Sequence, residues 1–240
     1  MVTRGALSAA ATLLLTGCAS ATFGETGTFE AMLNVSERVN VLAFDPTRFF
    51  REEDGHDRSM IRIAYTGDDY AWPVYSIAVM AGCLPGEARS PACGDRLTAR
   101  MVRAPAPPDL DRPRQRGSAL VAGLVERGEV SRSGLRNGLT SAGVEWLEAD
   151  GRSCPDFVDK LGASADLQWT PREVSHPDSS GEIRIVVHAD IVSVTFDKFA
   201  RRSTYEGYIA EGSPAAWAVE LAAVLETCWK PAPAPAPWLA

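Results

Sequence analysis

The stretch 60-MIRIAYTGDDYAWPVYSIAVMAGC-83 predicts two neighbouring strands of a β-sheet. Residues 60–65 alternate between apolar and other side chains, which is typical of a strand with one buried face. Residues 74–83 are apolar on both faces, and this pattern predicts a central strand. Between these runs, the sequence TGDDY at 66–70 has the composition of a turn. The predicted fold is therefore built around this pair of strands.

Two further segments show the two-residue period of strands. From Phe29 to Ala43, seven of the eight odd-numbered residues are apolar, which predicts a half-buried strand or a strand pair. The segment 182–199, EIRIVVHADIVSVTFDKF, is apolar at odd positions through Ile191 and at even positions from Val192. Such a switch of parity predicts a bulge or tight turn near Asp190.

Three segments predict short helices, at 118–128, 154–162 and 214–229. In the last, Ser213 is a suitable N-cap and Pro214 falls at the first helical position. Its apolar side chains follow helical spacing and include Cys228. These elements together predict an α+β fold: a mostly antiparallel sheet with several short helices packed on it and two disulfides.

The N-terminus has the features of an export signal followed by a lipidation site. Arg4 precedes an apolar run of about 11 residues, which is too short to span a bilayer as a helix. The run ends in Leu15-Thr16-Gly17-Cys18. This motif resembles the lipobox of bacterial lipoproteins, and the resemblance covers residues 1–20. An ordinary cleaved signal, or a core helix that contains a cysteine, is the alternative.

The resemblance implies that residues 1–17 are a signal peptide removed before Cys18. The Cys18 thiol would carry a diacylglyceryl group with acyl chains such as palmitate, and two or more chains anchor a protein stably. Ala19 follows the pattern of outer-membrane lipoproteins, so we expect the chain in the cell envelope, on the periplasmic face of the outer membrane. Residues 18–27 are then a lipidated tether.

Export would place the remaining cysteines in an oxidising compartment, where an even number favours disulfides. Cys83 and Cys93 flank a loop rich in Pro and Gly, which predicts that they pair and leaves Cys154 to pair with Cys228. Catalytic thiols usually show a C-x-x-C spacing, which is absent here. Free thiols are the other alternative.

The domain organisation follows from composition. Residues 28–230 are expected to form a single α+β domain, interrupted by a proline-rich surface loop at 103–117. Arg103, Arg112, Arg114 and Arg116 make this loop locally basic. It is either a solvated loop or a contact for anionic lipid or cell-wall polymer. The Pro–Ala tail at 231–240 should be an extended polyproline II segment that folding does not need.

Charge and motifs limit the functional classes. The formal net charge of −7 argues against general nucleic-acid binding, which uses concentrated positive charge. Common nucleotide, hydrolase and metalloprotease motifs are absent from the sequence, and we predict no cofactor. The acidic segment REEDGHD lies at 51–57, but a calcium loop centred on it would have Phe50 and Ile61 where oxygen ligands are needed. We therefore interpret it as a solvated turn and predict no metal site.

His188 and Asp190 are the one pair with a catalytic spacing. They lie two residues apart on the expected polar side of a strand, with Arg184, so the carboxylate is placed to orient the imidazole. No nucleophile adjoins them in sequence, and a solvated strand face is the alternative. We favour a non-catalytic envelope lipoprotein that binds a protein or envelope polymer, or supports envelope structure. An envelope hydrolase with a site near His188 and Asp190 is the second hypothesis.

Overall fold

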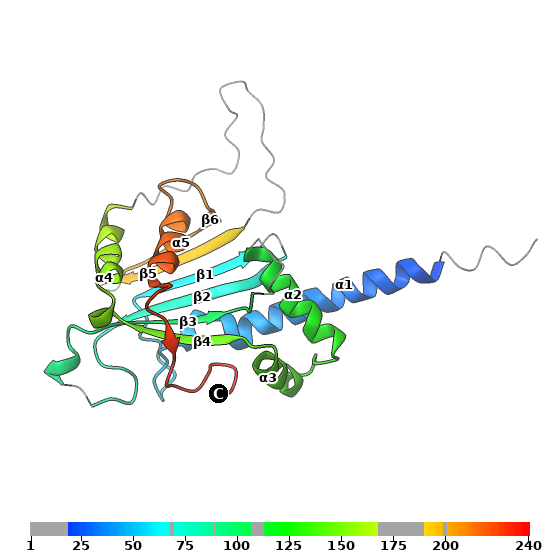
Figure 1. Cartoon of the computed structure of the whole chain (residues 1–240), viewed down its shortest axis with the longest axis horizontal. Helices are drawn as coiled ribbons and strands as arrows, with labels where there is room; N and C mark the ends of the chain where they lie inside the picture. Colours follow the sequence, from blue (N-terminus) through cyan, green and yellow to red (C-terminus); the bar gives the residue numbers. More distant parts are fainter. Residues whose placement is uncertain (1–18, 68–69, 89, 107–112, 168–189, 199–200) are drawn as a thin grey trace, which may run out of the picture.

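The computed structural model describes residues 19–67, 70–88, 90–106, 113–167, 190–198 and 201–240. Within these ranges, seven strands form one antiparallel sheet in the order β6-β5-β1-β2-β3-β4-β7, and five α-helices pack on it (Figure 1). The strands are β1 (Ile61–Gly67), β2 (Trp72–Ala81), β3 (Leu97–Arg103), β4 (Glu145–Asp150), β5 (Ile191–Lys198), β6 (Arg201–Tyr208) and β7 (Lys230–Pro231). The helices are α1 (Ala19–Val39), α2 (Pro113–Glu126), α3 (Arg132–Ser141), α4 (Pro155–Gly162) and α5 (Pro214–Leu225). This arrangement confirms the predicted α+β class.

The β1–β2 hairpin lies at the centre of the sheet, as predicted. Ile63 pairs with Ile77 and Tyr65 with Tyr75 in the antiparallel register. Every residue of β2 except Ala81 is buried, because helices cover both faces of this strand. The apolar run at 74–83 therefore marks the central strand correctly.

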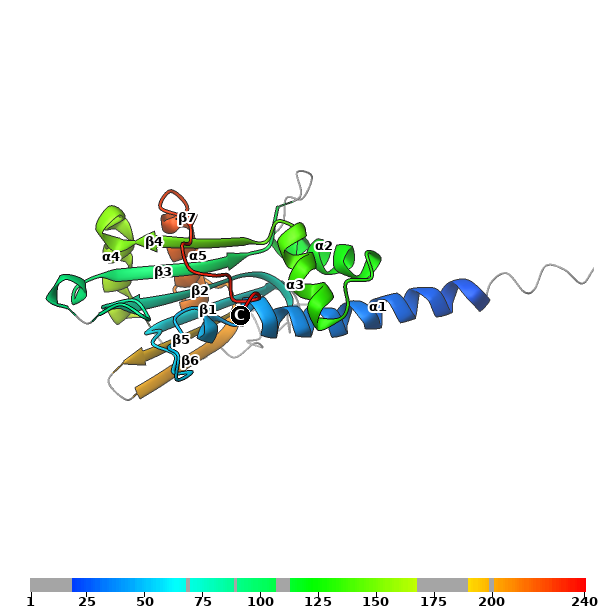
Figure 2. The same cartoon turned by 90° about the horizontal axis from the view of Figure 1, so that it is seen from below.

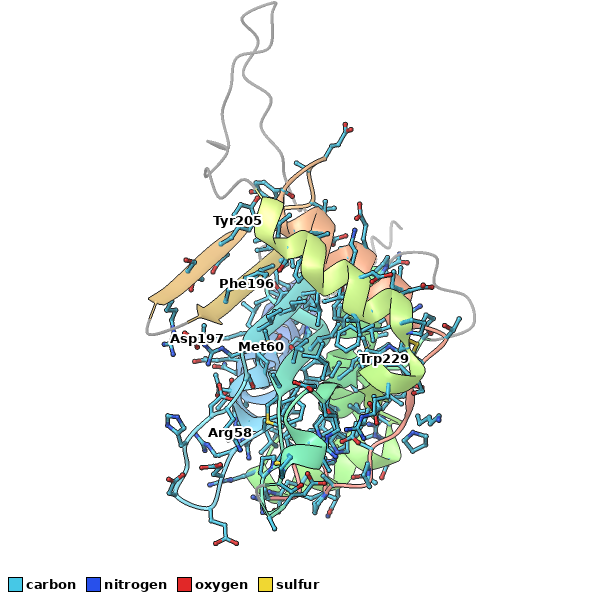
Figure 3. All side chains as sticks on the ribbon, turned by 90° about the vertical axis from the view of Figure 1, so that its left-hand side faces the viewer. Arg58, Met60, Phe196, Asp197, Tyr205 and Trp229 are labelled. Atoms are coloured by element: carbon cyan, nitrogen blue, oxygen red, sulfur yellow. A yellow bond between two sulfur atoms is a disulfide. The ribbon has the colours of Figure 1, made fainter. Side chains whose placement is uncertain are left out.

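One face of the sheet is covered by α4 and α5, which Figure 3 shows side by side above the strands. Ser213 caps α5 by accepting a hydrogen bond from the Ala216 amide at 3.1 Å, as predicted. The Trp217 ring lies 5.3 Å from that of Phe196 on β5, and its indole N–H donates to the Lys160 carbonyl. These contacts join both helices to the sheet.

Both predicted disulfides are present. Cys154, at the N-cap of α4, bonds to Cys228, and their Cα atoms are 5.9 Å apart. Helix α5 ends at Leu225, so Cys228 lies in the turn beyond the helix and not on it, unlike the prediction of a helix to residue 229. The second disulfide joins Cys83 and Cys93 at a Cα separation of 4.9 Å between β2 and β3.

The opposite face is covered by the N-terminal segment, α2 and α3. The predicted strand at 29–43 is wrong, because this segment forms α1 and a π-helical extension, η1 (Asn40–Phe44), followed by a short 3-10 helix, η2 (Pro46–Arg48). Its buried residues, Val35, Val39, Leu42 and Ala43, follow the three- and four-residue spacing of a helix. Three of these four residues have odd numbers, so the same pattern also fits the two-residue period of a strand.

Helix α1 also includes most of the predicted tether, because it begins at Ala19. Figure 1 shows its N-terminal end extending beyond the sheet, with the C-terminal half packed on the domain. Among the described residues, no helix combines the length and apolar character needed to cross a bilayer.

The predicted proline-rich loop is shorter than expected. Arg103 ends β3 and Pro113 begins α2, so only the middle of 103–117 lies between elements. The helix predicted at 118–128 is present and starts earlier. A glycine is needed in its first half, because a Cβ on Gly117 would lie 2.6 Å from the Pro73 carbonyl oxygen of β2.

The parity prediction at the end of the chain is partly within the described residues. From β5 onward, the even positions Val192, Val194 and Phe196 are buried, as expected. The first half of that segment, 182–189, lies outside the described residues, so the bulge near Asp190 stays a prediction.

The C-terminal segment packs on the domain, in contrast to the expected undocked tail. Lys230 and Pro231 form β7 on the edge of β4, and the chain then runs towards α3 (Figure 2). Trp238 is 3% exposed, and its indole N–H donates to the Thr140 hydroxyl of α3. The repeated Pro–Ala pattern does not predict this docking, because Trp238, the large apolar residue that packs on the domain, comes after the repeat.

We expect Trp238→Ala to lower the free energy of unfolding by about 3 kcal/mol, since it removes a buried aromatic ring. In a chain of this size the melting temperature should fall by roughly 6–12 °C. Leu239→Ala is the matched control, because Leu239 is 56% exposed and its truncation should have little effect. Equal melting temperatures for the two variants would show that the docked tail does not stabilise the domain.

Candidate functional site

The residues singled out from the sequence do not converge on one site in the described structure. Cys18, Arg184 and His188 lie outside the described residues. The four other cysteines form the two disulfides at different places in the fold. In the basic loop, Arg112 is not described, and Arg103 instead forms ion pairs with Glu145 and Glu226.

Asp190 contacts a tyrosine. The Tyr65 hydroxyl on β1 donates to Asp190 Oδ2 at 2.7 Å, which attaches the start of β5 to β1. Because His188 is not described, the predicted pairing of its imidazole with this carboxylate stays untested. The contact that the structure gives Asp190 fits a structural role.

The acidic segment 51–57 forms an exposed turn. Gly55 has φ of +84°, a left-handed conformation that glycine adopts without strain. Asp54 accepts a hydrogen bond from the His56 amide at 2.9 Å, so its carboxylate supports the turn. In the described ranges, His, Cys, Asp and Glu side chains do not gather in any group of three that could hold a metal ion.

A different site lies where the end of α1 meets η2 and the start of α3. Here a pocket of about 640 Å³ is lined by four arginines, Arg38, Arg48, Arg51 and Arg132. Its volume is in the range of small-molecule sites. We call it the arginine pocket. The other lining residues are Glu37, Val41, Leu42, Asp45 and Leu135.

Arg48 holds the pocket together. Its guanidinium donates to the carbonyl oxygens of Val41 and Leu42, at the C-terminal end of the helical segment, and to that of Pro237 at 2.8 Å. A cation at this end of a helix interacts favourably with the helix dipole and satisfies free carbonyls. Arg48 thereby links η1, at the end of the N-terminal helical segment, to the C-terminal tail.

Positive charges crowd around Arg48. Burial lowers the pKa of the Arg48 guanidinium below its ordinary value, and Asp45 opposes this shift. The neighbouring charges of Arg51, Arg132 and Arg136 lower the same pKa further. The arginines of the pocket therefore repel one another, and a bound anion would relieve this repulsion.

Two of these arginines have side chains available to a ligand. Within the described part of the chain, neither the Arg51 nor the Arg132 side chain makes a hydrogen bond or ion pair, and both residues are exposed. Arg38 donates to the Val130 carbonyl, and Arg136 donates to that of Ala240. The pocket thus combines fixed arginines with two unpaired ones, an arrangement suited to phosphate or carboxylate groups.

Sequence reasoning missed this pocket because its residues come from distant segments. The strand predicted at 29–43 includes Arg38, and the sequence patterns above predict no helix in the region of α3. The signal for α3 was present: Ser131 caps the helix by accepting from the Gly134 amide, and Leu135 and Leu139 are buried at four-residue spacing. That spacing would also have placed Arg132 and Arg136 on one side of a helix.

Comparisons with known proteins give no relative for this chain: no protein-family model, no curated protein and no solved structure matches it.

We expect Arg132→Gln to leave the free energy of unfolding unchanged or slightly higher, because the substitution removes like-charge repulsion and no hydrogen bond. Arg48→Gln should lower it by about 1–3 kcal/mol, since three carbonyl contacts are lost. Urea unfolding of both variants measures the difference. A loss of more than about 1 kcal/mol for Arg132→Gln would show that this side chain supports the fold.

Proposed function

We propose that this chain is a lipid-anchored, non-catalytic binding protein of the bacterial envelope that holds an anionic envelope molecule in the arginine pocket. The observation that carries the binding function is the convergence of four arginines on one pocket of a chain whose net charge is −7. Charged residues of one sign in a concave site concentrate ligands of the opposite sign.

The unequal use of arginines supports a binding role for the pocket. Arg62 and Arg100, which are buried in the sheet, form ion pairs with Asp57 and Glu148. Such pairing offsets the cost of removing a charge from water. The unpaired side chains of Arg51 and Arg132 repel their neighbours and contribute no described contact to the fold. Repulsion between exposed positive side chains is expected at a site where a bound anion supplies the opposite charge.

The anchor is supported by the lipobox at 15–18 and by the position of α1. This helix begins at the residue after Cys18, has 21 residues and spans about 30 Å at 1.5 Å per residue. Its N-terminal end extends away from the sheet (Figure 1). A lipid on Cys18 would therefore hold the domain through α1, with the arginine pocket at the opposite end of the helix. Ala19 favours the periplasmic face of the outer membrane.

Hydrolysis near Asp190 is not part of this proposal. The described partner of that carboxylate is a tyrosine hydroxyl, and no described cysteine thiol is free to act as a nucleophile, since the four in the described residues are in disulfides.

Pyrophosphate binding to the full-length Cys18→Ser chain, measured by calorimetry, tests the pocket. The double variant Arg51→Gln/Arg132→Gln should bind at least tenfold more weakly, because two charge-assisted contacts are lost. The control Arg152→Gln removes one positive charge beside α4, away from the pocket, and should bind normally. Raising the salt concentration should weaken binding. Absence of binding, or an equal loss in Arg152→Gln, would contradict the proposed function.

Mass spectrometry of the membrane fraction tests the anchor. We expect an acylated Cys18 as the first residue, and Cys18→Ser should release the chain from the membrane. Recovery of an unmodified, soluble wild-type chain from native cells would contradict lipid anchoring. This result is independent of the pyrophosphate experiment, so the anchor and the pocket are tested separately.

A further inference from the structure

A second hollow lies directly beside the arginine pocket. It has a volume of about 470 Å³ and runs between α1, η1, β1 and the residues that connect β1 to β2. We call it the apolar groove, because most of its lining is made of apolar side chains. Its lining residues are Leu33, Glu37, Asn40, Val41, Phe44, Asp45, Ala64, Thr66, Tyr70 and Ala71.

The two hollows share a wall. Glu37, Val41 and Asp45 line both of them. These residues are four apart: Glu37 lies in α1, Val41 in η1, and Asp45 directly follows η1, so they lie along one side of this segment. Val41 lies in the middle of this wall and is 65% exposed. A ligand that crosses Val41 would occupy the groove and the pocket together.

The groove is a formed feature of the fold. The Ser36 hydroxyl of α1 and the Asn40 side-chain amide of η1 both donate to the Ala71 carbonyl, at 3.0 and 2.8 Å. Ala71 has φ of +53°, a left-handed conformation that is uncommon for residues other than glycine. These two hydrogen bonds, one from α1 and one from η1, hold this turn against the helical segment. On the inner side, Phe44 is 3% exposed, and its carbonyl accepts from Ser76.

Two acidic residues in the shared wall do not cancel the arginines. The Asp45 carboxylate accepts from the Thr47 amide and hydroxyl, at 3.0 and 2.7 Å, and so caps η2. Glu37 is exposed. Four arginines against two acids leave the pocket net positive, and Arg136 adds a further charge near Arg48.

We propose that the ligand of this site is an anionic amphiphile with a single apolar chain, with its phosphate or carboxylate in the arginine pocket and its chain in the apolar groove. This inference rests on the proposed function, because it names the class of envelope molecule that the arginines bind. The ligand would cover Val41 and the apolar lining of the groove, which is otherwise in contact with water.

The site fits a separate amphiphile molecule better than the surface of a bilayer. Both hollows are open to solvent and share Val41, so one extended molecule can occupy the two together. In the proposed arrangement, moreover, the site lies at the end of α1 away from the anchor, about 30 Å along the helix. An amphiphile can therefore be carried at a distance from the anchoring membrane.

Calorimetry with the full-length Cys18→Ser chain compares pyrophosphate, decyl phosphate below its micelle concentration and neutral decyl maltoside. Co-sedimentation measures binding of the same chain to phosphatidylglycerol vesicles. We expect decyl phosphate to bind at least tenfold more tightly than pyrophosphate, since methylene burial adds to the ionic contacts. Decyl maltoside should bind at least tenfold more weakly than decyl phosphate. Vesicles should sediment little of the chain.

Two variants test the groove itself. Val41→Asp places a negative charge on the shared wall, and Ala64→Leu fills the groove from β1. Each should abolish the advantage of decyl phosphate over pyrophosphate. Val158→Asp changes a valine on α4 that is 40% exposed and should keep that advantage. Melting temperatures identify any variant that fails to fold, and the other variant then provides the test.

The outcomes separate this inference from the proposed function. Equal affinity for pyrophosphate and decyl phosphate would overturn the amphiphile and leave anion binding in place. Vesicle binding without binding of monomeric decyl phosphate would overturn it in favour of a membrane surface. Failure of both phosphates to bind would overturn the anion-binding function as well.

Discussion

Burial of β2 on both faces is the constraint on which the rest of the structure depends. Ile77 and Val79 point to the side of α4 and α5, whereas Ala78 and Met80 point to the side of α1 and α2. One helical layer could cover only half of these side chains, so the sheet needs a layer on each side. The N-terminal segment supplies part of the second layer, and this is why it folds as a packed helix.

The same constraint explains how the sheet accommodates charge. Arg62 and Arg100 face Ala78 from the two neighbouring strands, β1 and β3. Arg62 forms ion pairs with Asp57 and with Asp197, which is labelled in Figure 3. Arg100 pairs with Glu148, donates to the Phe49 carbonyl and lies over the Phe50 ring. The N-terminal segment therefore covers the sheet with groups that satisfy buried arginines.

The sequence was most informative where one short segment carries the pattern. The hairpin at 60–83, both cysteine pairs and the cap of α5 were predicted because the deciding residues are adjacent or few. The strand predicted at 29–43 is wrong, since the positions of Val35 and Val39 fit both the two-residue period of a strand and the four-residue spacing of a helix. Burial by a distant partner, β2, selects the helix. The arginine pocket was not predictable as a site, because Arg48 and Arg132 meet only after α3 and η2 have packed.

The arginine pocket and the docked tail are parts of one arrangement. Arg48 donates to Pro237, and Arg136 donates to the Ala240 carbonyl, so the tail fixes two of the positive charges near the pocket. Trp238 anchors the tail on α3 through Thr140. The neighbouring charges of Arg51, Arg132 and Arg136 lower the pKa of the Arg48 guanidinium, whereas the tail contacts and the burial of Trp238 favour the docked arrangement. The buried Trp238 thus keeps the tail in place, and the tail in turn holds Arg48 and Arg136. In the described residues, the side chains of Arg51 and Arg132 stay unpaired. Because the fold leaves these two charges unpaired, a ligand is free to bind them.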